Sequence, residues 1–466
     1  MTFAGLIDRA HRLPPLLLIL AIGAFLRLYK IKERFSFDYD QEVPAQAAFE
    51  FFKNGKISLI GQELSFQGFF LGPLHNWIQF IPYGLCNLNP DCVPYFYVIL
   101  GLLTVVLIYL TTKSIFNPRV ALISSTIYSV SFTAISYEWG VNSNFFLLLS
   151  TLFLLFCLYK YFQQKGLYLV LGGLVSGIAI VNFNPIFIFN TLAFFLTSLL
   201  RGNRSWHLYS ISIFALFLNY VPLVIFNFRH DNILWNNFLN FLEQNINHSN
   251  YILAAWPLLS RVTIPFFTYY VFHSTHFLLV FAMLILTILG SYRILTSKNK
   301  YLFFLVLAPL INYTGLIFYK GHIPDYYFQL SALSVMIMMA IILSRYKILF
   351  ILFVSIFLWT NIDKNIRHRA VFNYQIKKQV VNYIIADTSP ATFNVYFDFL
   401  PGLNTGYEYL FKINKRLPVE GGENLYVVGA GDDSYFLKYR FQRSYPEKNV
   451  KEKIFNNAIR VISIVD

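Results

Sequence analysis

Long apolar runs, separated by short polar loops, recur along the first three quarters of the chain. Three of them, Pro14–Leu28 and residues 94–112 and 120–136, are close to the length that crosses a hydrocarbon core of ~30 Å. Similar runs continue to about residue 361, where the sequence becomes polar, charged and rich in turn residues. The pattern predicts an all-α polytopic membrane domain, residues 1–361, followed by a small extracytoplasmic α/β domain, residues 362–466.

The apolar runs predict about eleven transmembrane helices. Several are shorter than ~20 residues, which is compatible with tilted or re-entrant segments. Segment 72–85 is also apolar, but its prolines and the pair His75-Asn76 argue against a crossing. The runs lie near residues 14–28, 93–112, 120–136, 144–161, 167–182, 186–200, 207–226, 276–292, 301–319, 327–343 and 346–361.

The charges between the runs predict how the helices are oriented, because Lys and Arg concentrate in cytoplasmic loops. If segment 72–85 lies along the outer surface, the basic loops fall on one side, with Asp8 as their single acid, and the acidic loops fall on the other. Counting it as a span would place most basic loops outside. We therefore predict a multi-pass protein of the plasma membrane with a cytoplasmic N-terminus and an extracytoplasmic C-terminal domain.

Two outer loops are long, about residues 29–92 and 227–275, and each contains a helical pattern. In the first loop, residues 43–54 have Pro44 in a position that suits a first helical turn and an apolar face behind it. Helices of this kind lie on a membrane surface rather than cross it. The apolar faces consist of Ala47, Ala48, Phe51 and Phe52 in the first loop, and of Trp235, Phe238, Leu239 and Leu242 in the second.

The C-terminal region has a mixed pattern. Residues 374–386 carry apolar side chains at helical spacing, and three short β-like runs are bounded by turn residues. This combination predicts a small α/β domain. The runs are residues 393–397, 425–428 and 460–465.

Composition agrees with a membrane protein, since 56% of the 466 residues are hydrophobic and only 13% are charged. The formal net charge of +14 is explained by the cytoplasmic loops, so we predict a lipid bilayer and no nucleic acid as partner. Cys86 and Cys92 flank a short outer loop, and the sequence leaves open whether they form a disulfide or stay free. Cys157 falls within a predicted span.

Three acidic residues, Asp38, Asp40 and Glu42, lie close together just after the first span. Carboxylates at a membrane surface are costly unless they are solvated or used. One interpretation is a polar, solvated loop. The other is that one carboxylate acts as a general base beside an apolar pocket that tunes its pKa.

The order of several short motifs resembles glycosyltransferase family 39, which includes the protein O-mannosyltransferases and the aminoarabinose transferases of lipid A. The resemblance is good over roughly residues 1–200 and looser beyond them. The motifs are Phe37-Asp-Tyr-Asp-Gln-Glu-Val-Pro-Ala45, Gly55-Lys56, Gly72-Pro-Leu-His75, Tyr137-Glu-Trp-Gly-Val-Asn142 and His322-Ile-Pro-Asp-Tyr-Tyr327.

The resemblance implies a GT-C-like fold and transfer of a sugar from a polyprenyl-phosphate donor to an acceptor hydroxyl on the outer face, with inversion. Asp40 then inherits the role of general base. Gln41 stands where the family has a glutamate, and Asp38 is an additional acid, so Asp38 is the alternative base.

The remaining candidates are substrate contacts. Cations have to stabilise the phosphate leaving group, and the outer-face candidates are Lys56, Arg229, Arg261, Lys320 and His322. Further candidates are His75, Glu138, Asn142 and Asp325. Glu138 and Asn142 are open to a second interpretation as caps of a span, and Asp325 to one as an orienting group for Lys320 or His322.

No His, Asp or Glu cluster has the spacing of metal ligands, so we predict no metal and no cofactor. A divalent cation would need Asp38 and Asp40 to act together.

Two other functions fit a chain of this kind. A transporter or lipid flippase would place ionisable residues within its spans, whereas the predicted spans are nearly free of charge. A non-catalytic subunit of glycan assembly would also use an outer domain, but it would not need the acidic cluster. The acceptor, whether lipid, glycan or protein, is not encoded in any motif.

Overall fold

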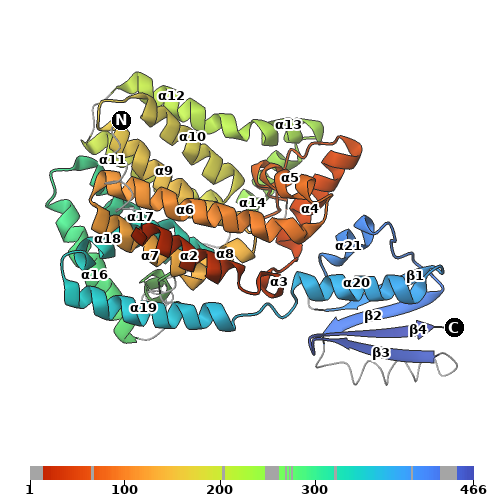
Figure 1. The fold of residues 1–466 in the computed structure, drawn as a ribbon. Helices are drawn as coiled ribbons and strands as arrows, with labels where there is room; N and C mark the ends of the chain where they lie inside the picture. Colours follow the sequence, from red (N-terminus) through yellow and green to blue (C-terminus); the bar gives the residue numbers. More distant parts are fainter. Residues whose placement is uncertain are drawn as a thin grey trace, which may run out of the picture.

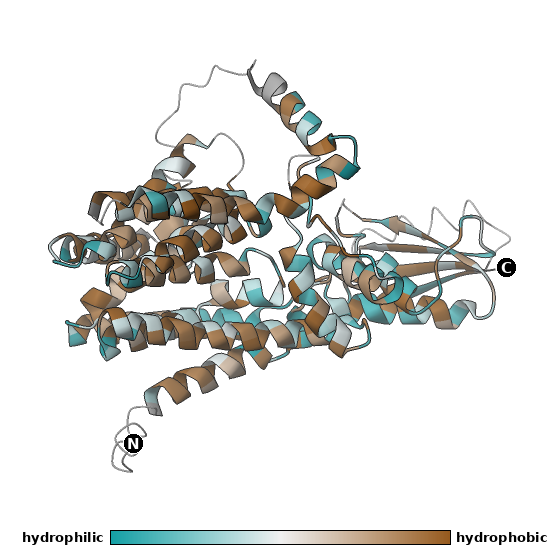
Figure 2. Cartoon of the chain, turned by 90° about the horizontal axis from the view of Figure 1, so that it is seen from above, coloured by the Kyte–Doolittle hydropathy of each residue, from teal (hydrophilic) through white to brown (hydrophobic). Residues whose placement is uncertain are grey.

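The computed structural model describes residues 14–64, 68–201, 205–246, 262–267, 270–271, 273, 277–319, 323–399, 402–430 and 449–465. They form a bundle of helices with a small mixed α/β domain at one end (Figure 1). Hydrophobic residues dominate the bundle, whereas hydrophilic residues are frequent in the C-terminal domain and in the elements beside it (Figure 2). The predicted fold class is therefore confirmed.

The helices of the bundle coincide with the predicted apolar runs. All residues of the helix Gln329–Leu343 are buried, which makes it the centre of the bundle. In chain order the helices are α2 Pro14–Leu28, α6 Val93–Ile115, α7 Pro118–Val130, α8 Phe132–Trp139, α9 Phe145–Tyr161, α10 Leu167–Asn182, α11 Ile188–Arg201, α12 Trp206–Phe217, α13 Val221–Arg229, α16 Phe277–Leu295, α17 Phe303–Phe318, α18 Gln329–Leu343 and α19 Lys347–Arg367.

Six helical stretches among the described residues are long and apolar enough to cross a membrane. A seventh crossing results if α7 and α8, which are bent by 52° at Ser131, count as one span. Four shorter apolar helices correspond to further predicted runs, namely Pro15–Leu28, Phe145–Tyr161, Leu167–Asn182 and Pro185–Leu200. The chain is a multi-pass membrane protein, and the number of about eleven spans stays a prediction.

The first long loop contains α3 (Ile31–Arg34), α4 (Tyr39–Asn54) and α5 (Leu74–Leu85). The helix predicted over residues 43–54 is present, but it begins earlier, so the acidic motif lies in its first turn. The 12 residues of α5 reach only about 18 Å along the helix axis. Because this is too short for a crossing, α5 agrees with the expectation that segment 72–85 does not span the membrane. In the second loop, α14 (Ile233–Ile246) confirms the predicted helix.

The C-terminal domain contains a four-stranded sheet of order β1-β2-β4-β3, in which β1 and β2 are parallel and the other pairs antiparallel. The predicted helix and all three predicted strands are present, whereas α21 and β3 were not predicted. The charged sequence of β3 hides its strand pattern, and as an edge strand it can keep those charges in water. The elements are α20 Tyr374–Thr388, β1 Phe393–Asp398, α21 Tyr407–Ile413, β2 Asn424–Ala430, β3 Asn449–Phe455 and β4 Ile459–Val465.

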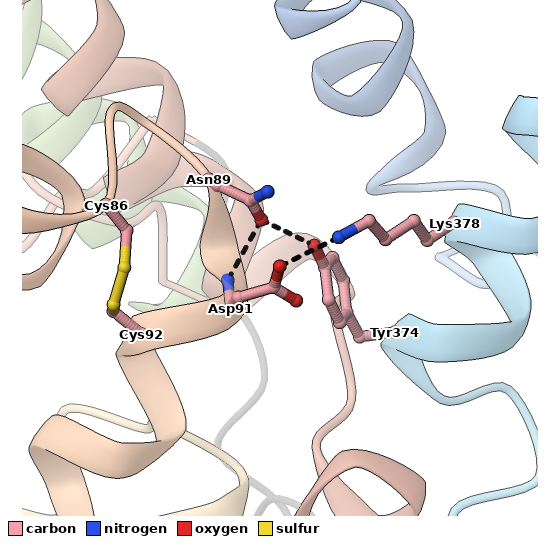
Figure 3. Close-up of a disulfide and its surroundings, with 6 residues drawn as sticks. All are labelled: Cys86, Asn89, Asp91, Cys92, Tyr374 and Lys378. Atoms are coloured by element: carbon pink, nitrogen blue, oxygen red, sulfur yellow. Dashed lines mark hydrogen bonds and ion pairs between the residues drawn. A yellow bond between two sulfur atoms is a disulfide. The ribbon is translucent and has the colours of Figure 1, made fainter.

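A disulfide between Cys86 and Cys92 closes the short loop between α5 and α6, which answers the question that the sequence left open. This loop also contacts the C-terminal domain (Figure 3). Lys378 of α20 forms an ion pair of 2.8 Å with Asp91, and the hydroxyl of Tyr374 donates a hydrogen bond of 2.8 Å to the Asn89 side chain. The C-terminal domain is thus attached to the loop between α5 and α6 by polar side chains as well as by the chain itself.

Candidate functional site

The acidic motif is positioned by the way α4 begins. The side chain of Gln41 accepts a hydrogen bond of 2.8 Å from the backbone N–H of Asp38, which closes the first turn of the helix. The amide group of the same Gln41 side chain donates to the carbonyl of Gly140, after α8. A glutamate at this position would accept hydrogen bonds but could not donate one when ionised. The glutamine therefore joins the start of α4 to the loop that follows α8.

Two cavities meet at this first turn. One, of about 760 Å³, is lined by polar and tyrosine side chains and by Gly402 of the C-terminal domain. The other, of about 630 Å³, extends toward the bundle and includes Phe69, Phe183, Phe241 and Tyr327 in its lining. The linings of the two cavities have four residues in common, which are Asp40, Asn142, Pro324 and Tyr326.

Asp40 is half-buried and faces both cavities. Its carboxylate accepts a hydrogen bond of 2.9 Å from the Asn142 side chain, and no Lys, Arg or His within the described ranges forms an ion pair with it. Burial raises the pKa of Asp40, and the neighbouring charge of Asp38 raises it further. These are the conditions under which a carboxylate accepts a proton readily near neutral pH.

Asp38 has a different environment, although it lies in the same cavity. Its carboxylate forms an ion pair of 2.6 Å with Lys377 of α20, whose side chain is completely buried. The ammonium group of Lys377 also donates to the carbonyls of Phe37, at 3.0 Å, and Thr405, at 2.9 Å. Burial lowers the pKa of Lys377, and the negative charge of Asp38 together with its hydrogen bond opposes that fall. The charge of Asp38 is therefore balanced by a lysine from the C-terminal domain.

Glu42, the third acid of the motif, caps a helix. Its carboxylate accepts hydrogen bonds from the backbone N–H groups of Gly406, at 2.7 Å, and Tyr409, at 3.1 Å, at the start of α21. Burial raises the pKa of Glu42, and these two N–H groups oppose that rise. An acid at the positive end of a helix is favourable, so Glu42 joins α4 to the C-terminal domain.

Asn142 belongs to a chain of amide side chains along the wall of the cavities. Its side chain donates to Asp40. Its side-chain oxygen accepts hydrogen bonds from the backbone N–H of Asn144, at 2.8 Å, and from the Asn144 side chain, at 2.6 Å. The side-chain oxygen of Asn144 in turn accepts a hydrogen bond of 2.9 Å from the Asn184 side chain. The preceding residue, Val141, has a φ of 47°, which is unusual for a β-branched residue. A strained turn of this kind is characteristic of sites where a side chain must be held in one place.

Glu138 lies apart from the cavities, although it belongs to the same sequence motif as Asn142. Its side chain is fully buried and forms a bidentate ion pair with Arg27 of α2, at 2.6 and 2.8 Å. Arg27 also donates to the carbonyls of Ser129, at 2.8 Å, and Gly23, at 3.1 Å. Glu138 therefore has its partners within the protein and does not line the candidate site.

Three further candidates also lie outside both linings. His75 is buried on α5, where its ring nitrogen shares a hydrogen bond of 2.8 Å with the hydroxyl of Tyr97. Burial lowers the pKa of His75 to about 3, so this histidine is neutral. Lys56 and Arg229 are exposed at the ends of α4 and α13.

Asp325 lines the more polar cavity together with Asp38 and Asp40. Arg261, Lys320 and His322 lie outside the described residues. Within the described part of the chain no Lys, Arg or His lines either cavity, and no group of three His, Cys, Asp or Glu side chains is arranged to hold a metal ion.

Sequence reasoning missed two residues of this site. Lys377 lies 339 positions from Asp38, in a helix whose other residues explain its pattern without any site. Tyr326 was noted only as part of an aromatic turn. A signal for Lys377 did exist, because it is a lysine on a helix with apolar neighbours at positions 376 and 380, where an unpaired charge would be costly.

Comparisons with known proteins extend these observations. Residues 71–226 match the family model of dolichyl-phosphate-mannose-protein mannosyltransferases. No curated protein matches the sequence.

Two solved structures share the fold. The apo structure of ArnT from Cupriavidus metallidurans is 12% identical and has a TM-score of 0.50, with 96% of this chain and 97% of that chain covered. The oligosaccharyltransferase AglB from Archaeoglobus fulgidus, solved in complex with an inhibitory peptide and a dolichol-phosphate, is 12% identical with a TM-score of 0.52, and 93% of this chain and 70% of that chain are covered.

The resemblance inferred from the sequence motifs is thus confirmed, since the matching family and both structures are those of glycosyltransferases. The chain is a multi-pass membrane protein that resembles the dolichyl-phosphate-mannose-protein mannosyltransferases over residues 71–226 and has the fold of the GT-C glycosyltransferases.

Proposed function

We propose that the protein transfers a sugar from a polyprenyl-phosphate donor to a hydroxyl group of an acceptor, with inversion at the anomeric carbon and with Asp40 as general base. The observation that carries this proposal is the position of Asp40 between two cavities of different character. An acceptor hydroxyl in one cavity and a donor sugar in the other would both be within reach of the same carboxylate.

The cavity of about 630 Å³, called the aromatic cavity here because of its Phe and Tyr side chains, suits the donor, and the cavity of about 760 Å³ is called the polar cavity. Phe and Tyr side chains pack against the apolar face of a sugar ring and against an isoprenoid chain. The polar cavity suits the acceptor, and because Gly402 contributes to its lining, the C-terminal domain is positioned to influence which acceptor enters.

In the reaction, Asp40 takes the proton of the acceptor hydroxyl while its oxygen attacks the anomeric carbon. The new C–O bond forms on one face of the sugar as the bond to the phosphate oxygen breaks on the other, which inverts the configuration. The products are the glycosylated acceptor and the free polyprenyl phosphate. The proton stays on Asp40 until it passes to water.

The leaving phosphate requires positive charge, and the described lining of the cavities contains no cation. We therefore retain Arg261, Lys320 and His322 as the residues proposed to bind the phosphate. Lys320 follows directly after Tyr319, which is part of the lining of the aromatic cavity.

Asp40 is a better base than Asp38 because of their partners. The carboxylate of Asp38 is already engaged in an ion pair with the buried ammonium group of Lys377. Among the described residues Asp40 lacks such a partner, and its carboxylate accepts a hydrogen bond only from Asn142.

The orientation of the site is also part of the proposal. The basic loops at the other end of the bundle favour a cytoplasmic location there, so Asp40 and the C-terminal domain would face outward from the plasma membrane. Donor and acceptor would then be delivered on the extracytoplasmic side.

The test is turnover by the purified protein with a panel of polyprenyl-phosphate sugars, measured as release of the free lipid phosphate. We expect release with at least one donor and its loss in the double variant D38N/D40N. Absence of release with every donor, or full release by the double variant, would contradict the proposal.

A further inference from the structure

The end of the bundle opposite Asp40 contains a second pair of cavities. Helix α6 begins beside the disulfide loop and runs 23 residues, about 34 Å, to Ile115. Beyond its end lie two adjoining cavities of about 480 and 630 Å³. Both are lined by Asn117, Ser344 and Arg345, so they form one continuous depression between the ends of α6, α7, α16 and α18.

This depression has an apolar floor and a basic rim. Ile115, Ile294, Leu302 and Ile341 are all buried and line its base. Three arginines line its edge, and they come from separate elements, which are Arg119 in the first turn of α7, Arg293 in the last turn of α16 and Arg345 between α18 and α19.

Within the described part of the chain the three arginines have no acidic partner. None of them forms an ion pair within the described part of the chain, and no Asp or Glu is among the lining residues of either cavity. The preference for basic residues on the cytoplasmic side explains why cations occur at this end. It does not by itself account for three exposed arginines, from distant parts of the chain, that line one depression.

We propose that this depression binds the phosphate of an anionic phospholipid headgroup. Guanidinium groups are suited to phosphate because their donors match its oxygens in pairs, and basic pockets between transmembrane helices are known to bind such headgroups. The site is separate from the transfer reaction and does not depend on it.

The surroundings favour a lipid over a soluble phosphate. Apolar side chains next to two of the arginines are exposed on the outside of the bundle, where acyl chains would lie. Leu295, two residues after Arg293, is 55% exposed, and Ile348, three residues after Arg345, is 75% exposed. A headgroup held by the arginines would therefore have its acyl chains against these side chains.

The test is titration of the full-length protein, in discs of phosphatidylcholine, with fluorescent phosphatidylglycerol. The variant R119Q/R293Q/R345Q should weaken binding on the order of a hundredfold, since each arginine near a membrane surface contributes about fivefold. The matched variant K113Q/K160Q/K165Q removes three charges from the same end of the bundle but from residues outside the depression, and it should have little effect. The single variant R345Q, expected to weaken binding about fivefold, tests the site if the triple variant does not fold.

Equal losses in the two triple variants would overturn the proposal, because diffuse surface charge would then account for the binding. Inorganic phosphate is the probe that tests whether the depression binds a soluble phosphate instead of a lipid headgroup. If it bound the wild-type protein as tightly as the lipid does, the phosphate group alone would be recognised and the assignment to a lipid would be wrong.

Discussion

Asp40 and Glu138 are both carboxylates at least partly shielded from bulk water, yet they have opposite environments. Glu138 is fully buried, and Arg27 pairs with both of its oxygens. Asp40 is half-buried and lines two cavities, and among the described residues its carboxylate accepts one hydrogen bond, from Asn142. A buried charge that is completely paired contributes to the fold, whereas one that faces a cavity without a cation is available for chemistry.

The comparison also shows how a protein assigns different tasks to neighbouring acids. Asp38, Asp40 and Glu42 follow one another within a single helical turn. Asp38 pairs with Lys377 and Glu42 caps α21, so both hold the C-terminal domain against the loop. Of the three, Asp40 is the one whose carboxylate is left facing both cavities.

The largest effect is expected from D40N, which removes the carboxylate proposed as the general base. Removal of a general base lowers the rate of transfer by about 10²–10⁴-fold, while the melting temperature of the purified protein should stay close to the wild-type value. The measurement is lipid-phosphate release at saturating donor. E42Q is the control on the same turn, and its rate should fall far less. A D40N variant that keeps most of its rate would exclude Asp40 as the base.

The structural role of the buried carboxylate of Glu138 is tested by E138Q. It leaves Arg27 buried and charged without a counterion, which should destabilise the protein by about 3–5 kcal/mol. The measurement is the thermal transition of the purified protein in detergent. The matched variant R27Q/E138Q removes both charges and should recover much of the loss. If E138Q instead retained its stability and lost only turnover, Glu138 would be a substrate contact, as the sequence first suggested.

The role of Lys377 is tested by the pH dependence of the transfer rate of K377M. Because burial and Asp38 raise the pKa of Asp40, loss of activity on the acidic side should begin at a higher pH than for an ordinary aspartate. A base works only when it is deprotonated, so a further rise in its pKa moves that loss to still higher pH. Without Lys377 the charge of Asp38 is unbalanced, and at neutral pH the rate should fall on the order of tenfold.

The control for this effect is the double variant D38N/K377M, which removes the unbalanced charge and should return the acidic limb of the profile toward the wild-type position. A purely structural role of Lys377 would lower the rate at all pH values alike, and D38N would not correct it.

A smaller effect is expected from N142A. It removes the hydrogen bond to Asp40, and a bond to a charged group of this kind corresponds to about tenfold in rate. The change should be in kcat rather than KM if Asn142 orients the base. N144A, one hydrogen bond further from Asp40, is the matched comparison and should reduce kcat less.

Much of the fold followed from the sequence because its causes are local. Each predicted apolar run coincides with a helix, since length and hydrophobicity are visible within a short window. The start of α4 was predicted too late, because the hydrogen bond between Gln41 and the backbone of Asp38 is not apparent from an apolar pattern. Strand β3 was missed because charged side chains on an edge strand resemble a loop.

The site was only partly predictable. Asp38, Asp40, Asn142 and Asp325 do line one cavity, and all four belong to motifs that the sequence displays. What could not be predicted is which acids have partners. Arg27 is 111 residues from Glu138, and Lys377 is 339 residues from Asp38, so only the folded chain shows that these two charges are balanced, whereas Asp40 has no ion pair with another described residue.

The disulfide between Cys86 and Cys92 makes the folding of this end of the bundle sensitive to redox conditions. Disulfides form and persist in oxidising compartments, whereas thiols in the cytosol are kept reduced. The bridged loop carries Asp91, the anchor of Lys378, and it lies at the same end of the bundle as Asp40. We therefore expect assembly of the C-terminal domain to depend on the oxidation state of the compartment that surrounds the Cys86–Cys92 loop.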